Sequence, residues 1–303
     1  MRARRANAVG SLLIAALLTL VGCASNTEGT GSQPQASATG SANPNAVQKD
    51  DALAAQVPDA IKSDGKLKVG TDPTYEPSEF KDSSGKIIGF DVDLGTAIAR
   101  KLGLTAEFQE SKFDNIIPSL GSKYELGMSS FTDSKEREKA VDFVTYFVAG
   151  TAWAAKDASL DPNNACGKRV AVQTGTVQET EDLPAKNKKC TDAGKPKIQV
   201  LRYDAQDEAT NAVVLGRADA VLADLPVIVA AVTKTNGALR RVGSNYDTAP
   251  YGIAIAKTSG TLKDAVLGAV KALIADGTYK SILERWKVAD GAITNPVING
   301  ARG

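Results

Sequence analysis

After residue 60, hydrophobic positions recur every second residue in some segments and at helical spacing in others. The segment 66–71 alternates at period two, which indicates a strand, whereas Leu94, Ile98 and Leu102 follow helical spacing up to Gly103, which ends the helix. Asp91 is predicted to cap this helix, and Asp114 a short helix that carries Ile116, Ile117 and Leu120. Further strands are predicted at 105–109, 126–128, 169–172, 198–201, 218–222 and 251–256, and further helices at 205–215, 262–274 and 279–286. Strands separated by helices of this length favour βαβ units, an α/β fold and mostly parallel sheets.

The order of these elements predicts two lobes. A second group of strands and helices begins after Trp153, and a last strand and a terminal pair of helices follow it. We therefore expect the chain to leave the first lobe, build the second and return, with crossing strands near 146–155 and 248–256 as the hinge. The predicted domains are 61–148 plus 252–290 for lobe 1, 149–251 for lobe 2 and 291–303 for a C-terminal tail.

The N-terminal segment has a different pattern. An apolar run from Val9 to Val21 follows three arginines and is shorter than the roughly 20 residues that span a bilayer, which indicates a secretory signal. Leu20-Val21-Gly22-Cys23 resembles a bacterial lipobox, which implies that Cys23 is lipidated, that the signal peptide 1–22 is removed and that the protein is anchored on the extracytoplasmic face of the cell membrane. An uncleaved membrane helix with a chance cysteine is the alternative.

The residues after Cys23 predict a tether. Residues 24–45 contain no large apolar side chain, so they cannot bury enough surface to offset the entropy of ordering them. Extended to residue 60, the segment 23–60 is predicted to be a lipidated flexible linker with a mean reach on the order of 35 Å.

Composition excludes several kinds of chemistry. The chain has no histidine, which excludes His-ligated zinc, a Ser-His-Asp triad and a Cys-His dyad, and we expect no metal or cofactor. Removal of 1–22 lowers the basic residues from 36 to 33 against 35 acidic ones, so the net charge becomes −2 and no basic field is left for nucleic acid. Cys166 and Cys190 remain, and outside the cell we expect them to form a disulfide.

Polar and aromatic residues gather where the predicted strands end, which is where open α/β sheets bind ligands. The candidate site consists of Asp72, Tyr75, Phe113, Ser129, Ser130, Thr132, Arg137, Gln173, Thr176 and Asp224.

Part of this set suits the charged end of a zwitterionic amino acid. Arg137 can grip a carboxylate with two parallel hydrogen bonds. Thr132 and Thr176 can add hydroxyl and backbone N–H donors, the latter at the start of a helix. Asp224 and the Ser130 carbonyl can accept hydrogen bonds from an ammonium group.

The remaining residues suit the side chain of such a ligand. Tyr75 and Phe113 can pack on both sides of an aliphatic stem, and Asp72 can contact the end of that side chain. Each assignment has a structural alternative. Arg137 lies in a charge run that suits a solvated helix face, and Asp224 can cap the following helix. The two aromatic residues can belong to the core, and Asp72 precedes a proline in an ordinary turn signal.

Seven short motifs follow one another between Leu67 and Lys287. They are Gly70-Thr71-Asp72-Pro73-Thr74-Tyr75-Glu76-Pro77, Gly89-Phe90-Asp91-Val92-Asp93-Leu94, Phe113-Asp114-Asn115-Ile116-Ile117-Pro118-Ser119-Leu120, Ser129-Ser130-Phe131-Thr132 with Arg137, Val172-Gln173-Thr174-Gly175-Thr176, Gly216-Arg217-Ala218-Asp219-Ala220-Val221 with Asp224, and Asp276-Gly277-Thr278-Tyr279. In this order they resemble the polar amino-acid family of solute-binding proteins that feed ABC importers. The resemblance implies a two-lobed periplasmic-binding-protein-like fold (type II, venus flytrap) with two hinge strands.

The resemblance also implies a function and roles for the site residues. It assigns the α-carboxylate to Arg137 with the backbone amides of Thr132 and Thr176, and the α-ammonium to Ser130 and Asp224. Tyr75 and Phe113 would flank the side chain, with Asp72 near its tip. We accordingly expect a monomer that captures an amino acid and delivers it to ABC transporter permease subunits.

The sequence leaves the ligand open. Gln173 and Ala223 stand where glutamine binders of the family tend to carry Lys and His. Asp72 favours a cationic or hydrogen-bond-donating tip, so glutamine-like and basic amino acids are both expected, with an acidic ligand below them.

Two other functions remain as alternatives. An enzyme on the same scaffold, similar to cyclohexadienyl or arogenate dehydratase, would need a general acid in the cleft, for which Glu76 and Glu79 are the candidates near the first strand. A ligand-sensing module is the other alternative.

Overall fold

The computed structural model describes residues 43–301. The predicted signal peptide 1–22, Cys23 and the linker up to residue 42 lie outside the described residues. Within 43–301, no helix has the length and the apolar character that a membrane-spanning segment requires.

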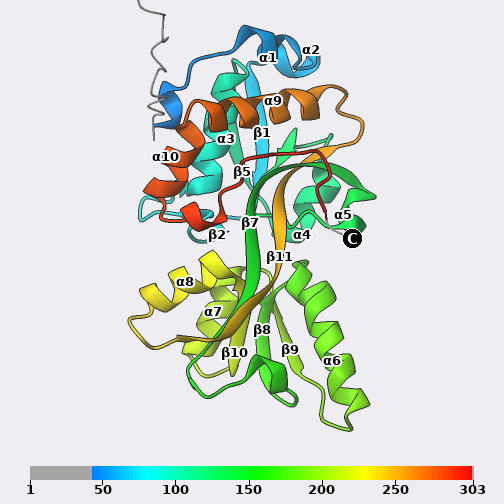
Figure 1. Ribbon diagram of the computed structural model, residues 1–303, viewed down its shortest axis with the longest axis vertical. Helices are drawn as coiled ribbons and strands as arrows, with labels where there is room; N and C mark the ends of the chain where they lie inside the picture. Colours follow the sequence, from blue (N-terminus) through cyan, green and yellow to red (C-terminus); the bar gives the residue numbers. More distant parts are fainter. Residues whose placement is uncertain (1–42, 302–303) are drawn as a thin grey trace, which may run out of the picture. The chain divides into compact units, whose positions relative to one another are not determined.

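One eight-stranded sheet runs through the described residues (Figure 1). Its strands are, in spatial order, β5 (Thr105–Glu110), β1 (Lys66–Thr71), β6 (Leu126–Gly127), β11 (Arg240–Ala256), β7 (Val141–Ala155), β10 (Ala220–Asp224), β8 (Arg169–Gln173) and β9 (Gln199–Tyr203). A small second sheet contains β2 (Thr74–Tyr75), β3 (Glu79–Lys81) and β4 (Ile87–Ile88). The α/β fold predicted from the hydrophobic pattern is thereby confirmed.

Two long antiparallel strands, β7 and β11, join the two ends of this sheet. They pair from Arg240 opposite Ala155 to Ala256 opposite Val141, with irregular register between Val242 and Gly252. β1 pairs in parallel with β5 and β6 at one end, and β8 pairs in parallel with β9 and β10 at the other. The chain crosses between the two groups on β7 and returns on β11 (Figure 1).

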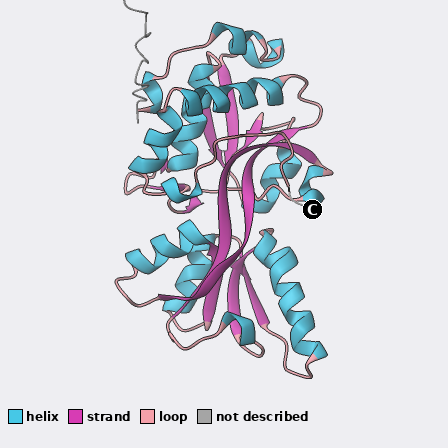
Figure 2. Ribbon diagram, in the orientation of Figure 1, coloured by secondary structure: helices cyan, strands magenta, loops and turns pink. Residues whose placement is uncertain are grey.

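Helices cover the sheet around both groups of strands (Figure 2). The first group is associated with α3 (Phe90–Lys101), α4 (Phe113–Ile116), α5 (Lys135–Glu138), α9 (Leu262–Ala275), α10 (Thr278–Arg285) and the 3₁₀ turns η2 (Ile117–Ser119) and η5 (Ala289–Gly291). The second group is associated with the 3₁₀ turn η3 (Pro162–Asn164), the π-helical turn η4 (Gln178–Asp182), α6 (Leu183–Asp192), α7 (Gln206–Val214) and α8 (Leu225–Lys234). Each group has hydrophobic cores of its own, which include Leu94 and Val266 in the first and Val213 and Ile228 in the second.

The linker prediction is wrong over residues 43–60, which are folded. They form η1 (Pro44–Ala46) and α1 (Asp51–Ala55), and α2 (Asp59–Lys62) begins there. Val57 is buried in the core beside Leu53, and the Thr261 hydroxyl donates a 2.6 Å hydrogen bond to the Gln56 carbonyl. Large apolar residues resume after the polar segment 24–45 at helical spacing, so this stretch can bury a stripe that the preceding residues lack.

Two predicted helix caps are also wrong. Asp91 lies inside the first turn of α3, whose N-cap is Gly89, and its carboxylate accepts hydrogen bonds from the Tyr146 hydroxyl and the Ser130 amide instead. Asp114 lies inside α4, whose N-cap is Lys112. At the start of α4, the Phe113 amide donates to Asp72, which lies far away in the sequence.

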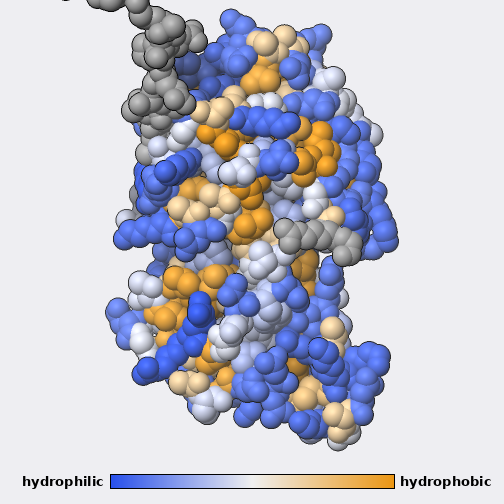
Figure 3. Space-filling model, in the orientation of Figure 1, coloured by the Kyte–Doolittle hydropathy of each residue, from blue (hydrophilic) through white to orange (hydrophobic). Residues whose placement is uncertain are grey.

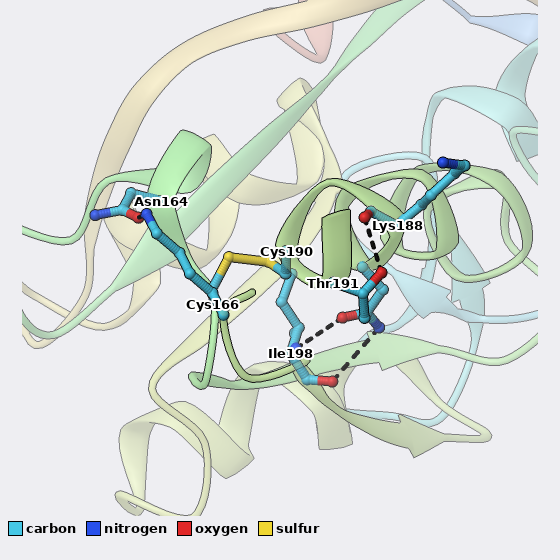
Figure 4. Close-up of a disulfide and its surroundings, with 8 residues drawn as sticks. Asn164, Cys166, Lys188, Cys190, Thr191 and Ile198 are labelled. Carbon is cyan, nitrogen blue, oxygen red and sulfur yellow. Dashed lines mark hydrogen bonds between the residues drawn. A yellow bond between two sulfur atoms is a disulfide. The ribbon is translucent and has the colours of Figure 1, made fainter. Parts of the chain in front are cut away.

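The predicted disulfide between Cys166 and Cys190 is confirmed (Figure 4). It ties the segment before β8 to α6, and the Asn187 side chain accepts a 2.7 Å hydrogen bond from the Ile198 amide beside it.

A partly hydrophobic groove lies beside the crossing strands. The groove of about 730 Å³ runs along α8 and is lined by Leu225, Pro226 and Val229 together with Val148 of β7. Figure 3 shows hydrophobic residues gathered over α8, whereas hydrophilic residues cover much of the face in view.

Candidate functional site

A small cavity lies between the strand ends of the two groups. It is lined by Tyr75, Phe113, Ser129, Ser130, Thr132, Arg137, Thr176, Val177, Gln178 and Asp224. Eight of the ten residues predicted from the sequence are therefore brought together, and the other two, Asp72 and Gln173, adjoin them through Phe113 and Thr176. The cavity volume is about 10 Å³, which is room for about one water molecule.

Asp224, at the end of β10, is a hydrogen-bonding centre of the cavity. Its Oδ2 accepts from the hydroxyls of Tyr75 at 2.9 Å and Tyr251 at 2.7 Å, and its Oδ1 accepts from Gln178 Nε2 at 2.8 Å. Although Asp224 occupies the N-cap position of α8, its side chain makes no capping hydrogen bond. Burial raises the pKa of this carboxyl group, while the three donors oppose that shift. Asp224 lines the cavity, where its carboxylate can bind a cationic group.

Arg137 points its guanidinium at the same cavity from α5. It donates to the carbonyl of Thr132 at 2.8 Å and to that of Gly175 at 2.9 Å, and it lies 5.5 Å from the ring centres of Phe113 and Phe131. Burial lowers the pKa of Arg137 to about 10, so the group is still a cation at neutral pH. It differs from the exposed charges around it in α5 and is placed to bind an anion such as a carboxylate.

Asp72 forms a second buried acidic position. Its Oδ2 accepts 3.0 Å hydrogen bonds from the Phe113 amide and from Gln173 Nε2, and its Oδ1 accepts from the Thr74 hydroxyl at 2.7 Å. Burial raises the pKa of Asp72 to about 6, and the carboxylates of Asp207 and Glu110 contribute to the rise. A cationic or hydrogen-bond-donating group of a ligand would be favoured at this position.

The two serines after β6 connect the site to a buried acid pair. Ser129 Oγ accepts the Asp72 amide proton at 3.0 Å and donates to Glu79 Oε1 at 2.8 Å. Ser130 has a left-handed backbone (φ 51°), and its amide donates to Asp91 Oδ2 at 2.9 Å. Burial and the neighbouring Asp91 carboxylate raise the pKa of Glu79 well above its ordinary value.

The general-acid candidates of the enzyme alternative lie away from the cavity wall. Glu79 is fully buried behind Ser129, and Glu76 forms an ion pair with Lys234 at 2.6 Å. Neither residue is among those that line the cavity.

Sequence reasoning missed two polar residues of the site. Gln178 donates to both Asp224 and Thr151 from the turn after Thr176, and Tyr251 reaches Asp224 from β11. Gln178 stands two residues after a predicted strand-end position, which is the only local signal for it. Tyr251 belongs to a predicted crossing strand, and nothing in its neighbours along the chain indicates the direction of its hydroxyl.

Hydrogen bonds between the two groups of strands keep the cavity small. They join Tyr75 to Asp224, Gln173 to Asp72, and Arg137 to the Gly175 carbonyl. A ligand of amino-acid size needs far more volume than one water molecule, so its binding requires these contacts to open and its own polar groups to replace them. A groove of about 1050 Å³ adjoins the cavity at Thr132 and Gln178 and offers a route to it.

Residues 43–301 contain no cluster of three or more Cys, Asp or Glu side chains that could hold a metal ion. The donors and acceptors described above suit a small organic zwitterion instead.

Known proteins resemble this chain in sequence. Residues 67–289 match the family described as bacterial extracellular solute-binding proteins, family 3. The arginine-binding protein ArgT of Corynebacterium glutamicum is 39% identical over 251 residues, which cover 82% of each chain.

Solved structures of amino-acid-binding proteins are similar to this chain in fold. An ancestral arginine-binding protein bound to arginine has a TM-score of 0.67 and 38% identity, covering 73% of this chain and 98% of its own. An ancestral arginine-binding protein bound to glutamine has the same TM-score and identity, covering 74% and 98%. These similarities confirm the type II periplasmic-binding-protein fold.

Proposed function

This chain belongs to the bacterial extracellular solute-binding proteins, family 3, and from that premise we propose that it binds arginine outside the cytoplasm and delivers it to the permease of an ABC importer. It is an amino-acid-binding protein rather than an enzyme. The relative from Corynebacterium glutamicum is named for arginine binding, and both ancestral structures carry that name although one holds glutamine. A basic ligand is therefore favoured over the glutamine-like alternative that the sequence left open.

The surroundings of Asp72 carry the preference for a basic ligand. Asp72 is 4% exposed, and the negative charges of Asp207 and Glu110 both raise its pKa. Its amide partner, Gln173, is neutral. A guanidinium can offset this negative potential and supply planar donors to the carboxylate, whereas a neutral amide supplies donors alone.

We assign the rest of the ligand to the other end of the cavity. Arg137 and the backbone amides of Thr132 and Thr176 hold the α-carboxylate, and Asp224 with the Ser130 carbonyl holds the α-ammonium. This assignment is supported by the half-buried position of Arg137 on the cavity wall and by its two hydrogen bonds to carbonyl groups that a carboxylate can replace.

The side chain of the ligand then runs from this charged end towards Asp72. Tyr75 and Phe113 flank its stem, while Ser129 and Gln173 keep the Asp72 segment in place through their hydrogen bonds. Closure of lobe 1 (61–148 plus 252–290) on lobe 2 (149–251), hinged on β7 and β11, would enclose it, with 291–303 as the tail.

Isothermal titration calorimetry tests the ligand assignment. The purified protein is titrated with arginine, lysine, histidine, glutamine, citrulline and glutamate at pH 7.5. We expect micromolar or tighter binding of arginine, at least tenfold weaker binding of the neutral isostere citrulline, and no detectable heat from glutamate. Binding of glutamine as tight as that of arginine would overturn the basic preference, and no heat from any amino acid would overturn the function.

We further propose that Cys23 carries the lipid that anchors the protein on the extracytoplasmic face of the membrane. The support is the lipobox-like sequence Leu20-Val21-Gly22-Cys23. Cells fed with a labelled fatty acid should label the wild-type protein and not the Cys23→Ala variant, which should stay unprocessed. Labelling of both proteins would refute the assignment to Cys23.

A further inference from the structure

The segment 297–301 runs beside the first part of β7. The Thr145 amide donates to the Val297 carbonyl at 2.9 Å, and the Val297 amide donates to Thr145 Oγ1 at 2.9 Å. Asn299 exchanges two 2.9 Å hydrogen bonds with the backbone of Phe143, one through its amide and one through its side chain. These contacts place the segment firmly against the strand that carries the chain towards the second lobe.

The last two amides of this segment reach the short helix α5. The Gly300 amide donates to Asp133 Oδ2 at 2.7 Å, and the Ala301 amide donates to Glu138 Oε1 at 3.1 Å. Asp133 immediately precedes Ser134, the N-cap of α5, and Glu138 is the last residue of the helix. The segment therefore holds α5 at both of its ends.

The other contacts that hold the helix are mostly polar, and two of them come from Arg137, which donates to the Thr132 and Gly175 carbonyls. α5 contains four residues and no apolar side chain, so apolar packing contributes little to its position, and a helix of one turn has almost no stability of its own. Its internal supports are the Ser134 cap, which accepts from the Arg137 amide at 3.4 Å, and the ion pair between Lys135 and Glu138 at 3.0 Å.

The carboxylates of Asp133 and Glu138 require hydrogen-bond donors from the segment 297–301. Asp133 is 2% exposed, and burial together with the nearby Glu138 carboxylate raises its pKa. The amides of Gly300 and Ala301 supply hydrogen bonds to two acids that otherwise repel each other.

We propose that the segment 297–301 positions Arg137 for ligand binding by clamping α5 through Asp133 and Glu138. The inference rests on the proposed function, in which Arg137 holds the ligand carboxylate. Binding groups act only when their support keeps them within about 0.5 Å of the productive geometry. Loss of the clamp would let α5 shift, and the bidentate grip on the carboxylate would weaken while the contacts at Asp72 stay unchanged.

The test compares two truncated proteins. One ends at Pro296 and lacks 297–303, and the control ends at Ala301 and lacks 302–303 only. We expect the first truncation to weaken arginine binding about tenfold or more in calorimetry, with the control unchanged. Agmatine, which is arginine without its carboxylate, should bind both proteins equally, because it does not use Arg137. Equal losses for arginine and agmatine would show general damage and overturn the proposal, as would unchanged arginine binding.

A point variant covers the case in which the first truncation does not fold. Glu138→Ala removes the acceptor for the Ala301 amide, whereas Glu138→Gln retains an oxygen at that position. We expect several-fold weaker arginine binding for the alanine variant and recovery for the glutamine variant; equal binding by both would overturn the proposal.

The Arg137→Ala background separates this proposal from the proposed function. If Arg137→Ala does not weaken arginine binding, the assigned role of Arg137 is wrong. If Arg137→Ala weakens arginine binding but truncation at Pro296 has no effect on the wild-type protein, only the proposed role of the segment 297–301 is wrong. A clamp that works through Arg137 predicts little further loss when the truncation is added to Arg137→Ala.

Discussion

Replacement of Asp72 by asparagine isolates the charge that the proposed specificity depends on. An asparagine oxygen in the place of Oδ2 can still accept from the Phe113 amide and from Gln173, which both donate at 3.0 Å. The asparagine NH₂ group would then lie beside the Thr74 hydroxyl, 2.7 Å from the present Oδ1, and this hydroxyl can reverse its role and accept. Asp72→Asn thus retains the internal hydrogen bonds and removes one negative charge.

The size of the effect follows from this geometry. A hydrogen bond to a charged group contributes about 1.5–3 kcal/mol, which corresponds to roughly 10- to 150-fold in affinity. Two opposite unit charges 4 Å apart at an effective dielectric constant of 20 attract each other by about 4 kcal/mol. The expected loss of about 1.5–3 kcal/mol is therefore smaller than the attraction between a guanidinium and the Asp72 carboxylate. At pH 7.5 the wild-type carboxylate is mostly ionised, because its pKa is about 6.

Calorimetry with arginine and citrulline checks this reasoning. Arginine should bind Asp72→Asn about 10- to 150-fold more weakly than the wild type, whereas citrulline should change by about threefold or less. Asp114→Asn removes an exposed carboxylate of α4, the helix whose Phe113 amide donates to Asp72, and serves as the matched control. Wild-type arginine affinity should also rise between pH 5 and 7 as Asp72 ionises, and the variant should lack this rise. Unchanged arginine affinity, or equal losses for both ligands, would refute the role of Asp72.

Three further predictions concern the site and the fold. Arg137→Lys should weaken arginine binding about tenfold or more, because an ammonium cannot reproduce two parallel hydrogen bonds; equal calorimetric affinity would contradict this. Burial raises the pKa of Asp72 to about 6, above its value of about 3.9 in an unfolded chain, so the folded state binds more protons and this group stabilises it at low pH. The free energy of unfolding should therefore rise as the pH falls from 8 to 5, and urea titrations showing a fall would refute it. Cys166→Ser with Cys190→Ser should lower the unfolding free energy by roughly 3 kcal/mol without changing arginine affinity, and a large affinity loss would place the bridge in the site's support.

Local patterns in the chain predicted those features that depend on near neighbours. The strand over 66–71 and the helix stripe of Leu94 and Ile98 follow from periodicity, because alternating or helical burial is determined within a few residues. The strand-end rule then selected residues such as Asp224 and Arg137, which the structure places on one cavity.

Errors occurred where a distant partner competes with a local role. Asp91 has the chemistry of a helix cap, but Tyr146 and the Ser130 amide take its carboxylate into the interior. The segment 43–60 follows a polar tether, and its apolar residues such as Val57 are buried only because distant parts of the chain supply a core for them.

The sequence by itself determined the α/β alternation, the absence of histidine chemistry, the cysteine pair and the kinds of group available at the strand ends. Only the tertiary structure decided how these groups are used. Tyr75 and Asp224 stand 149 positions apart and meet at 2.9 Å, and the segment after Val297 comes back to the helix that carries Arg137. The physical reason is that periodicity reports on contacts within a few residues. The partner of a buried hydrogen bond is instead chosen by the packing of whole elements.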